Sequence, residues 1–283
     1  MTKQNIKIIK NIKDLHTVIK TWRDQKQTIG LVPTMGALHR GHLSLVSKML
    51  DNADKVIATI FINPKQFGAG EDLDRYPHNP EADSKLLAET GADAVFIPDM
   101  QDIYPEGFST NISVSGVSDG LCGATRPGHF DGVATIVTKL LIQAMPDVAI
   151  FGEKDFQQLA VIKQLQHDLD LPVKIISGAI IREDDGLALS SRNAYLTCDE
   201  RKIAVELSAT LKQAVVRANN GDDLRLIEAE CTKHLLDSGF KSVDYFSFAN
   251  AKTLQLADDL SQATQVLAAA RLGGTRLIDN FSV

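Results

Sequence analysis

Two histidines lie three residues apart in the run Pro-Thr-Met-Gly-Ala-Leu-His-Arg-Gly-His at residues 33–42. If a helix begins within this run, the rings of His39 and His42 share one face, and their N–H groups can reach the same phosphate chain. Free backbone N–H groups and the positive end of the helix dipole are expected to face that phosphate. Gly36 and Gly41 carry no Cβ, so a ligand can approach the backbone closely. The run therefore predicts a phosphate site.

A zinc site is the other chemistry that paired histidines can provide. No Cys or His stands at a plausible ligand spacing from them, and the motif His-Glu-x-x-His does not occur in the sequence. A lone histidine at a helix start is usually a solvated or capping residue, but that explanation fits a pair around a glycine less well. We therefore favour phosphate binding and expect no metal ligands.

Amide side chains follow the apolar run at residues 56–62, where Asn63-Pro64-Lys65-Gln66 begins. Polar groups just past the carboxyl end of a parallel strand lie where open α/β sheets bind ligands. An ordinary Asn-Pro turn explains Asn63, but it leaves the Gln66 amide available. This segment therefore predicts a second group of ligand-binding residues.

A third polar segment, Gly-Glu-Lys-Asp, follows the apolar run at residues 148–151. Lys154 supplies a compact positive charge for a phosphate, and Asp155 can cap a helix or orient a ribose or metal. Gln158 lies four residues beyond Lys154. One helical turn separates the two, so both can face the same cleft.

A fourth segment combines hydroxyls with an arginine at Ser190, Ser191 and Arg192. Hydroxyls donate to phosphate oxygens, and a guanidinium can bind them in a bidentate manner. An ordinary capped loop is the alternative for this segment. Arg126 and His129 form a further pair that can bind anions, although Arg126 by residue type alone could equally be a surface charge.

Apolar runs define the elements that must position these side chains. Short β-branched runs bounded by Gly, Pro or Asn predict buried strands at residues 6–9, 28–32, 56–62, 94–97, 148–151 and 173–181. Helical periodicity between them predicts an α/β fold with a parallel sheet over residues 1–181. Residues 182–283 predict a smaller α+β domain of two helices and strands joined at Gly273-Gly274, the last part of which is expected to carry no chemistry.

Composition sets further limits. The 283 residues are 44% hydrophobic and 23% charged, with a formal net charge of −6, which argues against a nucleic-acid scaffold. Three widely spaced cysteines without Cys-x-x-Cys predict reduced thiols. The first ten residues alternate Lys and Ile and lack the apolar core of a signal peptide. No apolar run reaches the ~18 residues of a membrane span. We therefore expect a cytoplasmic protein with neither nucleic-acid nor membrane partners.

The motif His-x-Gly-His at a strand-to-helix junction resembles the signature that nucleotidyltransferases share with class I aminoacyl-tRNA synthetases. The full phrase at 33–42 resembles one family among them, the pantothenate synthetases or pantoate–β-alanine ligases. Four more phrases are similar to that family, namely Asn-Pro-x-Gln-Phe at 63–67, Asp-Arg-Tyr-Pro at 74–77, Arg-Pro-Gly-His-Phe at 126–130 and Ser-Ser-Arg-Asn at 190–193, and the resemblance continues to the ending Thr-Arg-Leu-Ile-Asp-Asn at 275–280. Neither a Walker A sequence nor G-x-G-x-x-G competes with them.

This resemblance implies a Rossmann-like nucleotidyltransferase domain that activates pantoate with ATP. Pantoate attacks the α-phosphorus to form pantoyl adenylate and pyrophosphate, and β-alanine then attacks the acyl carbon to give pantothenate and AMP. The expected catalytic residues are His39, His42 (the family's proton donor), Lys154 and Arg192. The expected ATP-binding residues are Met35, Gly36, Ala37, Leu38, His39, Arg40, Gly41, His42, Gly152, Glu153, Lys154, Asp155, Ile181, Leu189, Ser190, Ser191 and Arg192. The expected residues for the other substrates are Asn63, Gln66, Tyr76, Arg126, His129 and Gln158, with Gln66 on pantoate near β-alanine and Tyr76 in a mobile gate loop.

The resemblance further implies Mg²⁺ with ATP and a homodimer. Two positions depart from the family's usual pattern. Arg40 stands where an acidic residue is usual and adds positive charge beside the phosphate site, and Leu189 stands in place of a methionine. Neither departure removes a proposed functional group.

Two other functions are compatible with the His-x-Gly-His motif. A nucleotidyltransferase of the phosphopantetheine adenylyltransferase type leaves the nucleotide on its product, but it lacks Asn-Pro-x-Gln-Phe and the Gln157-Gln158 pair, and such enzymes are usually shorter. A nucleotide sensor without catalysis is the other alternative. The two glutamines beside a full set of phosphate ligands argue against it.

Overall fold

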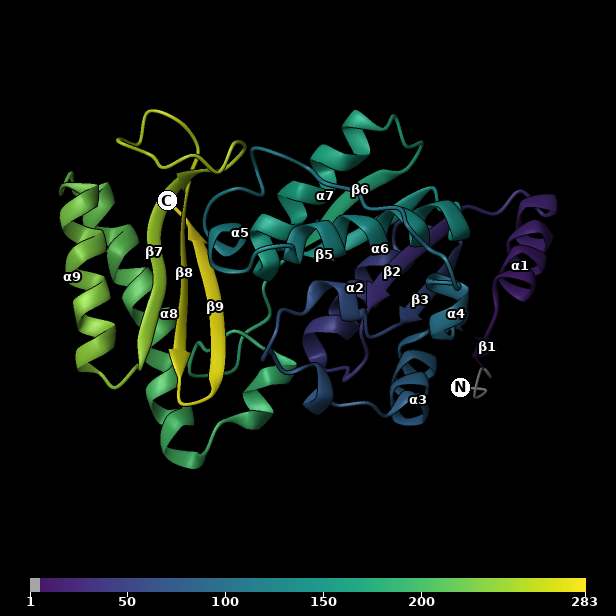
Figure 1. The fold of residues 1–283 in the computed structure, drawn as a ribbon, viewed down its shortest axis with the longest axis horizontal. Coiled ribbons are helices and arrows are strands. Elements are labelled where there is room, and N and C mark those ends of the chain that lie inside the picture. Colours follow the sequence, from purple (N-terminus) through teal and green to yellow (C-terminus); the bar gives the residue numbers. More distant parts are fainter. Residues whose placement is uncertain (1–5) are drawn as a thin grey trace. The chain divides into compact units, whose positions relative to one another are not determined.

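The computed structural model describes residues 6–283 (Figure 1). Residues 1–5, the start of the segment in which no signal peptide was expected, lie outside this part. The chain forms two compact units. The first comprises the described residues through Val114, Arg126–Glu153 and Val161–Ala179, and the second comprises Ser115–Thr125, Lys154–Ala160 and Ile180–Val283. The chain passes from the first unit to the second for the last time between Ala179 and Ile180, close to the expected boundary at 181–182. Two earlier segments, 115–125 and 154–160, also belong to the second unit.

The first unit contains a six-stranded sheet in which all neighbouring strands are parallel. Its strands are, in spatial order, β1 (Lys7–Ile9), β4 (Ala94–Phe96), β3 (Lys55–Ile60), β2 (Ile29–Thr34), β5 (Val148–Gly152) and β6 (Lys174–Gly178). The central strands β2, β3 and β4 contain no exposed residue, as expected for strands covered on both faces. The predicted Rossmann-like parallel sheet is confirmed.

Helices connect successive strands as crossovers. The helices of this part are α1 (Ile12–Asp24), α2 (Arg40–Leu50), α3 (Pro80–Thr90), α4 (Met100–Ile103) and α6 (His129–Ala144), and α7 (Phe156–Asp168) has residues in both units. The α1 helix contacts α6, and α2 contacts α3. Because parallel crossovers are right-handed, these two pairs cover opposite faces of the sheet.

The direction in which the chain crosses the sheet changes around β2. From β2 it passes to β3 on one side, and after β4 it returns to β5 on the other side. The carboxyl ends of β2 and β5 therefore flank a topological switch point, where open α/β sheets bind ligands. The histidine loop and the Gly-Glu-Lys-Asp segment both begin there.

The second unit holds a three-stranded antiparallel sheet in the order β7-β8-β9. Its elements are α5 (Cys122–Thr125), α8 (Cys198–Asn219), α9 (Leu224–Asp237), β7 (Ser242–Asn250), β8 (Thr264–Leu272) and β9 (Thr275–Ser282). Buried Leu207, Ile227 and Phe248 join α8, α9 and the sheet in one apolar core. Gly273 has a φ of 55° at the turn between β8 and β9, which confirms the expected hairpin.

Short 3-10 segments lie at several of the predicted sites. They are η1 (Pro64–Gln66), η2 (Leu73–Arg75), η3 (Glu153–Asp155) and η4 (Ser191–Tyr195). Within residues 6–283, no helix is both long enough and apolar enough to cross a membrane.

Candidate active site

His39 and His42 lie at the start of α2, where backbone N–H groups hold their rings. The Nδ1 of His39 accepts the N–H of Gly41 at 3.1 Å, and the Nδ1 of His42 accepts the N–H of His39 at 3.4 Å. The ring centroids are 4.1 Å apart, so the rings do lie together. A neutral imidazole that accepts at Nδ1 carries its proton at Nε2. Each histidine therefore has Nε2 as its donor atom.

Asp83 of α3 holds the backbone of the histidine loop. Its buried carboxylate accepts the N–H of Ala37 at Oδ2 and that of Leu38 at Oδ1, each at 2.9 Å. Ala37 has a φ of 51°, so the loop turns through the left-handed region at this residue. The expectation of free backbone N–H groups is wrong here, because Asp83 and the two imidazoles accept them. A phosphate at this loop would meet mainly side-chain donors.

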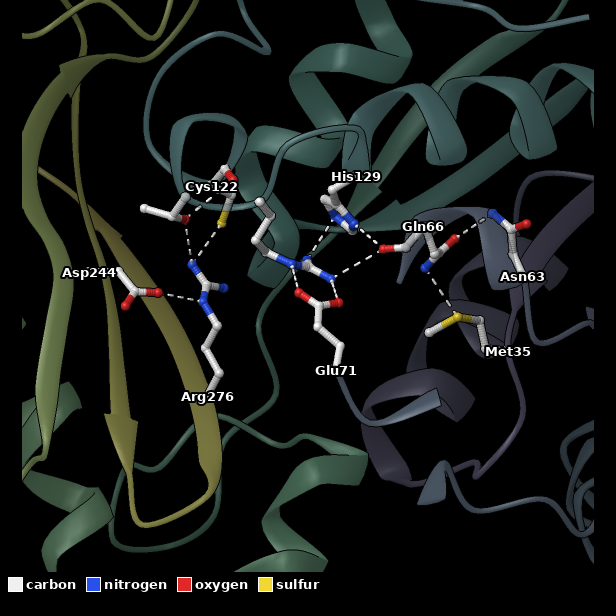
Figure 2. Close-up of polar contacts among 10 residues, drawn as sticks. Met35, Asn63, Gln66, Glu71, Cys122, His129, Asp244 and Arg276 are labelled. Atoms are coloured by element: carbon white, nitrogen blue, oxygen red, sulfur yellow. Dashed lines mark hydrogen bonds and ion pairs between the residues drawn. The ribbon is translucent and has the colours of Figure 1, made fainter. Parts of the chain in front are cut away.

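Gln66 ends the η1 turn after β3, and its side chain is held on two sides (Figure 2). Its Oε1 accepts the Nδ2–H of Asn63 at 3.1 Å, and its Nε2 lies 3.1 Å from the sulfur of Met35, to which it donates. Since β2 and β3 are neighbouring parallel strands, their following loops lie at the same edge of the sheet. The predicted acid-binding amide thus contacts the predicted phosphate loop.

Asn63 is 1% exposed, and its amide is fully engaged inside the first unit. Its Nδ2 also donates to the carbonyl of Gly132 at 3.1 Å, while its Oδ1 accepts the Tyr104 hydroxyl at 2.7 Å and the N–H of Lys65 at 3.3 Å. Burial raises the pKa of Tyr104 above its ordinary value, so this hydroxyl remains a donor. These contacts make Asn63 the residue that orients Gln66.

Arg126 and His129 hold the main chain of Gln66 (Figure 2). The guanidinium Nη1 of Arg126 lies 2.9 Å from the Nε2 of His129. Because an arginine can only donate, His129 accepts at Nε2 and keeps its proton on Nδ1, which donates to the carbonyl of Gln66 at 2.8 Å. The two predicted anion ligands are therefore joined to the predicted substrate amide through its backbone.

The expected gate segment at residues 68–80 is tied to the same cluster. Glu71 forms a bidentate pair with Arg126, with Nε–Oε1 at 2.7 Å and Nη2–Oε2 at 2.6 Å. Burial raises the pKa of Glu71, but the hydrogen bonds and charge of Arg126 outweigh it and bring the pKa to about 2. Tyr76 is buried, with its ring edge-on to Phe67 at a centroid distance of 6.0 Å.

The Gly-Glu-Lys-Asp segment ends β5 and forms η3. The hydroxyl of Ser177 on β6 donates to the Oε1 of Glu153 at 2.6 Å. The main-chain carbonyl of Lys154 accepts the Nδ2–H of Asn280 at 3.0 Å. No carboxylate in the described residues pairs with the Lys154 ammonium, so its charge is available to a phosphate. Asp155 is exposed.

The two glutamines at the start of α7 have different surroundings. Gln157 is 4% exposed, and its Oε1 accepts the N–H of Cys122 at 2.9 Å. Its Nε2 donates to the carbonyls of Val117 at 3.0 Å and Gly120 at 2.8 Å. Gln157 therefore braces the loop before α5, whereas Gln158, the predicted substrate residue, is half-buried.

The Ser190–Arg192 segment follows a small hairpin in the second unit. Arg182 and Ala188 form an antiparallel bridge, and the N–H of Leu189 donates to the carbonyl of Ile181 at 2.9 Å. The Oγ of Ser190 accepts the N–H of Arg192 at 3.3 Å and caps η4. Leu189 is buried, so the departure from methionine changes an apolar packing contact.

The two units divide the predicted residues between them. The first contains Met35, Gly36, Ala37, Leu38, His39, Arg40, Gly41, His42, Asn63, Gln66, Tyr76, Arg126, His129, Gly152 and Glu153. The second contains Lys154, Asp155, Gln158, Ile181, Leu189, Ser190, Ser191 and Arg192. Arg40 is exposed at the first position of α2.

Sequence reasoning missed Glu71, Asp83 and Tyr104. Each contacts a motif residue that is 41 to 55 positions away in the chain. Glycine and charged residues without periodicity at 68–80 predict a mobile loop but no partner for Glu71, and Asp83 resembles any acidic residue in the first turn of a helix. No local pattern marks such long-range contacts.

The sequence model of a family described as "Pantoate-beta-alanine ligase" matches residues 7–282. The pantothenate synthetase of Paramagnetospirillum magneticum is 51% identical over 98% of both chains, and that of Roseobacter denitrificans is 46% identical over 98% of both.

Two solved structures are similar across nearly the whole chain. Pantothenate synthetase from Thermus thermophilus has a TM-score of 0.89 and 39% identity, covering 98% of this chain and 99% of that chain. The Francisella tularensis pantoate-beta-alanine ligase, complexed with beta-gamma ATP and beta-alanine, has a TM-score of 0.84 and 36% identity, covering 98% of this chain and 97% of that chain. With its motifs, its fold and these matches in agreement, the chain belongs to the pantoate–β-alanine ligase family.

Proposed function

We infer that this protein condenses (R)-pantoate with β-alanine at the expense of ATP, giving pantothenate, AMP and pyrophosphate through a pantoyl adenylate. The observation that carries this inference is the contact between Gln66 and Met35, with 3.1 Å between Nε2 and Sδ. It joins an amide suited to an organic acid to the loop whose histidines suit a phosphate chain. A nucleotide-binding motif alone would not supply the acid site.

Activation of the carboxylate explains the need for ATP. The oxygen of a free carboxylate is a poor leaving group, so pantoate first attacks the α-phosphorus and pyrophosphate departs. β-Alanine can then attack the acyl carbon and displace AMP. Phosphoryl transfer of this kind asks the protein mainly for positioning and for stabilisation of charge.

The phosphate ligands of this proposal are donors of two kinds. His39 and His42 offer N–H donors at Nε2, and His42 is placed as the donor to the leaving group. Lys154 and Arg192 supply positive charge, and the hydroxyls of Ser190 and Ser191 complete the set. This division is supported by the tautomers of the two histidines and by the Lys154 ammonium, which pairs with no carboxylate within residues 6–283.

Amide side chains are proposed to hold the acid. Gln66 binds pantoate, with its side chain fixed by Asn63 and its backbone by His129. Gln158 supplies the second amide. Tyr76 and Arg126 are proposed to line the site from the gate segment and from the start of α6.

ATP is proposed to enter as its magnesium complex. Mg²⁺ in such sites is held largely by phosphate oxygens and water. In the described part of the chain, no group of three or more His, Cys, Asp or Glu side chains could hold a metal ion.

ATP–pyrophosphate exchange tests the proposed reaction. We expect exchange that requires pantoate and does not require β-alanine, because the adenylate forms in the first step. Exchange that occurs with another acid but not with pantoate would transfer the substrate assignment to that acid. Absence of exchange with every acid, together with tight ATP binding, would instead favour a nucleotide sensor.

We also propose that the enzyme is a cytoplasmic homodimer. Its three cysteines are free thiols, the state that a reducing compartment maintains. Analytical ultracentrifugation would test the dimer, and cell fractionation would test the location.

A further inference from the structure

The last strand of the chain carries two adjacent buried polar residues, Asp279 and Asn280, in the part where no chemistry was expected. Asp279 is 4% exposed and Asn280 is 3% exposed, both on β9. Buried polar side chains are costly unless they are paired, so their partners indicate why they are there. Consecutive residues of a strand face opposite sides of the sheet, which allows the two to serve different partners.

Asn280 holds the turn that carries Lys154. Its Nδ2 donates to the carbonyl of Lys154 at 3.0 Å, and its Oδ1 accepts the Nε2–H of Gln265 at 2.6 Å. The Oε1 of Gln265 in turn accepts the hydroxyl of Ser282 at 3.0 Å. Because the Lys154 carbonyl can only accept, the nitrogen end of the Asn280 amide points at Lys154, and its oxygen end is left to accept from Gln265. The backbone from which the Lys154 ammonium extends is therefore anchored to β9.

Asp279 holds the hairpin that leads to Ser190. Its carboxylate forms a bidentate pair with Arg182, with Nη1–Oδ2 at 2.6 Å and Nη2–Oδ1 at 2.9 Å. The guanidinium also lies over the ring of Phe281, 4.1 Å from its centroid. Phe281 is two residues beyond Asp279, so both contacts come from the same face of β9.

Arg182 also binds the second half of the hairpin, at Gly186 and Ala188. Its Nη1 donates to the carbonyl of Gly186 at 3.0 Å, and its backbone is bridged to Ala188. Asn193, just past the Ser190–Arg192 segment, donates from its Nδ2 to the carbonyl of Ala188 at 3.0 Å. The segment is thus connected on both sides to a hairpin that Asp279 holds.

We propose that Asp279 and Asn280 are positioning residues for the adenylation step, in which one strand sets the places of two of the loops that carry phosphate ligands, namely the Lys154 turn and the Ser190–Arg192 segment. This inference rests on the proposed roles of Lys154 and the Ser190–Arg192 segment. Neither Asp279 nor Asn280 is needed to touch ATP. Misplacement of a reacting group by about 1 Å can cost about 10²-fold in rate, so loss of this anchoring acts on the chemistry from a distance.

Two nearly isosteric variants remove the anchoring bonds separately. Asn280→Asp keeps an oxygen for Gln265 but loses the donor to Lys154, and Asp279→Asn loses the charge paired with Arg182. Asp244→Asn is the matched control. Asp244 accepts from the Nε of Arg276 at 2.7 Å, so it also pairs with an arginine in this sheet, but the pair contacts neither phosphate loop.

The two half-reactions distinguish positioning from general damage. Pantoate-dependent ATP–pyrophosphate exchange requires the phosphate ligands, whereas formation of pantothenate from synthetic pantoyl adenylate and β-alanine involves no triphosphate. In Asp279→Asn and Asn280→Asp we expect exchange to fall about 10²-fold, with a far smaller change in the second half-reaction. The Asp244→Asn control is expected to keep the wild-type ratio of the two rates. This ratio does not depend on the fraction of folded enzyme.

Equal losses in both half-reactions, or unchanged exchange, would overturn the positioning role. A wild-type enzyme without pantoate-dependent exchange would instead overturn the proposed function, and with it the ligand roles that this inference requires.

Discussion

His42 accepts a backbone N–H at Nδ1, so its Nε2 is the atom that can meet a phosphate oxygen. Replacement by Ala removes this donor, and we expect ATP–pyrophosphate exchange to fall about 10² to 10³-fold. Replacement by Gln places an amide N–H near the former Nε2, so it preserves a donor but not an acid. Substantial recovery in His42→Gln would identify His42 as a hydrogen-bond donor, whereas equal loss in both variants would identify it as a proton donor. Near-wild-type exchange in His42→Ala would refute either role.

Glu71 makes the stability of its ion pair with Arg126 depend on pH. Arg126 lowers the pKa of Glu71 from 4.5 to about 2, so the stabilisation is present above pH 4.5 and is lost as the pH falls toward 2. We expect Glu71→Gln to lower the free energy of unfolding at pH 7 by about 1 kcal/mol, because the pair is partly solvated. Denaturant titrations of both proteins between pH 2 and 7 provide the measurement.

The difference in unfolding free energy between the wild-type protein and Glu71→Gln should become smaller as the pH falls. A difference that stays constant across this range would show that the pair does not contribute through its charge. Glu89→Gln on α3 is a suitable control, because the ion pair of Glu89 with Lys85 is exposed to solvent.

The sequence predicted those parts of the site in which the interacting residues are close together in the chain. The pairing of His39 with His42 followed from their spacing, and the structure brings their rings together. The expectation of free N–H groups failed because the acceptor, Asp83, is contributed by another helix. A hydrogen bond across 46 positions leaves no periodic trace in the sequence.

At the scale of elements, the close approach of α6 to η1 places Gln66. A Cβ on Gly132 would lie 2.2 Å from the carbonyl oxygen of Lys65 and 2.6 Å from the nitrogen of Gln66. We expect Gly132→Ala to displace the η1 turn, to lower the free energy of unfolding by about 1 to 3 kcal/mol and to raise the KM for pantoate. Initial-rate kinetics and denaturant unfolding measure the two effects.

Gly274→Ala is the control for the Gly132 variant, because a Cβ at Gly274 meets no atom within 4 Å. It should leave both quantities close to wild type. An unchanged KM for pantoate in a destabilised Gly132→Ala protein would mean that the turn keeps its place without this contact.

Elements with strong local patterns were predictable. Runs of β-branched residues predict the buried parallel strands, and apolar residues at helical spacing from Val133 to Ala144 predict most of α6. The helix begins at His129, four residues before Val133, and its first turn, His-Phe-Asp-Gly, does not continue the apolar spacing that marks the rest. The roles of Asp279 and Asn280 were not predictable, since both belong to a strand whose partners lie in distant loops.

At the scale of the whole molecule, the three thiols differ in their access to solvent. Cys198 is exposed, whereas Cys122 and Cys231 are buried, and burial raises the pKa of Cys231 to about 11. Because the thiolate is the reactive form, we expect one fast thiol with a disulfide reagent at pH 8 and three after denaturation. Cys198→Ser should abolish the fast phase, and its persistence in that variant would contradict the assignment.

The division of the chain into two units depends on contacts that composition does not reveal. Residues 115–125 and 154–160 belong to the second unit. Gln157 bonds to Cys122, and Asn280 bonds to Lys154, which explains these assignments. The change in pattern along the chain predicts a boundary near residue 181. The assignment of residues 115–125 and 154–160 to the second unit could not be predicted, because it depends on contacts with residues far away in the chain.

Because Glu71 already pairs with Arg126, an anionic ligand that binds Arg126 has to compete with the Glu71 carboxylate. A carboxylate or phosphate that binds the Nε and Nη2 groups of Arg126 must displace Glu71. The free energy with which the ion pair restrains residues 68–75 therefore makes the binding free energy of the ligand less favourable. Conversely, an anion seated on Arg126 would release that segment and expose it to proteases. The fraction of Arg126 bound to an anion and the rate at which a protease cleaves this loop should therefore rise together.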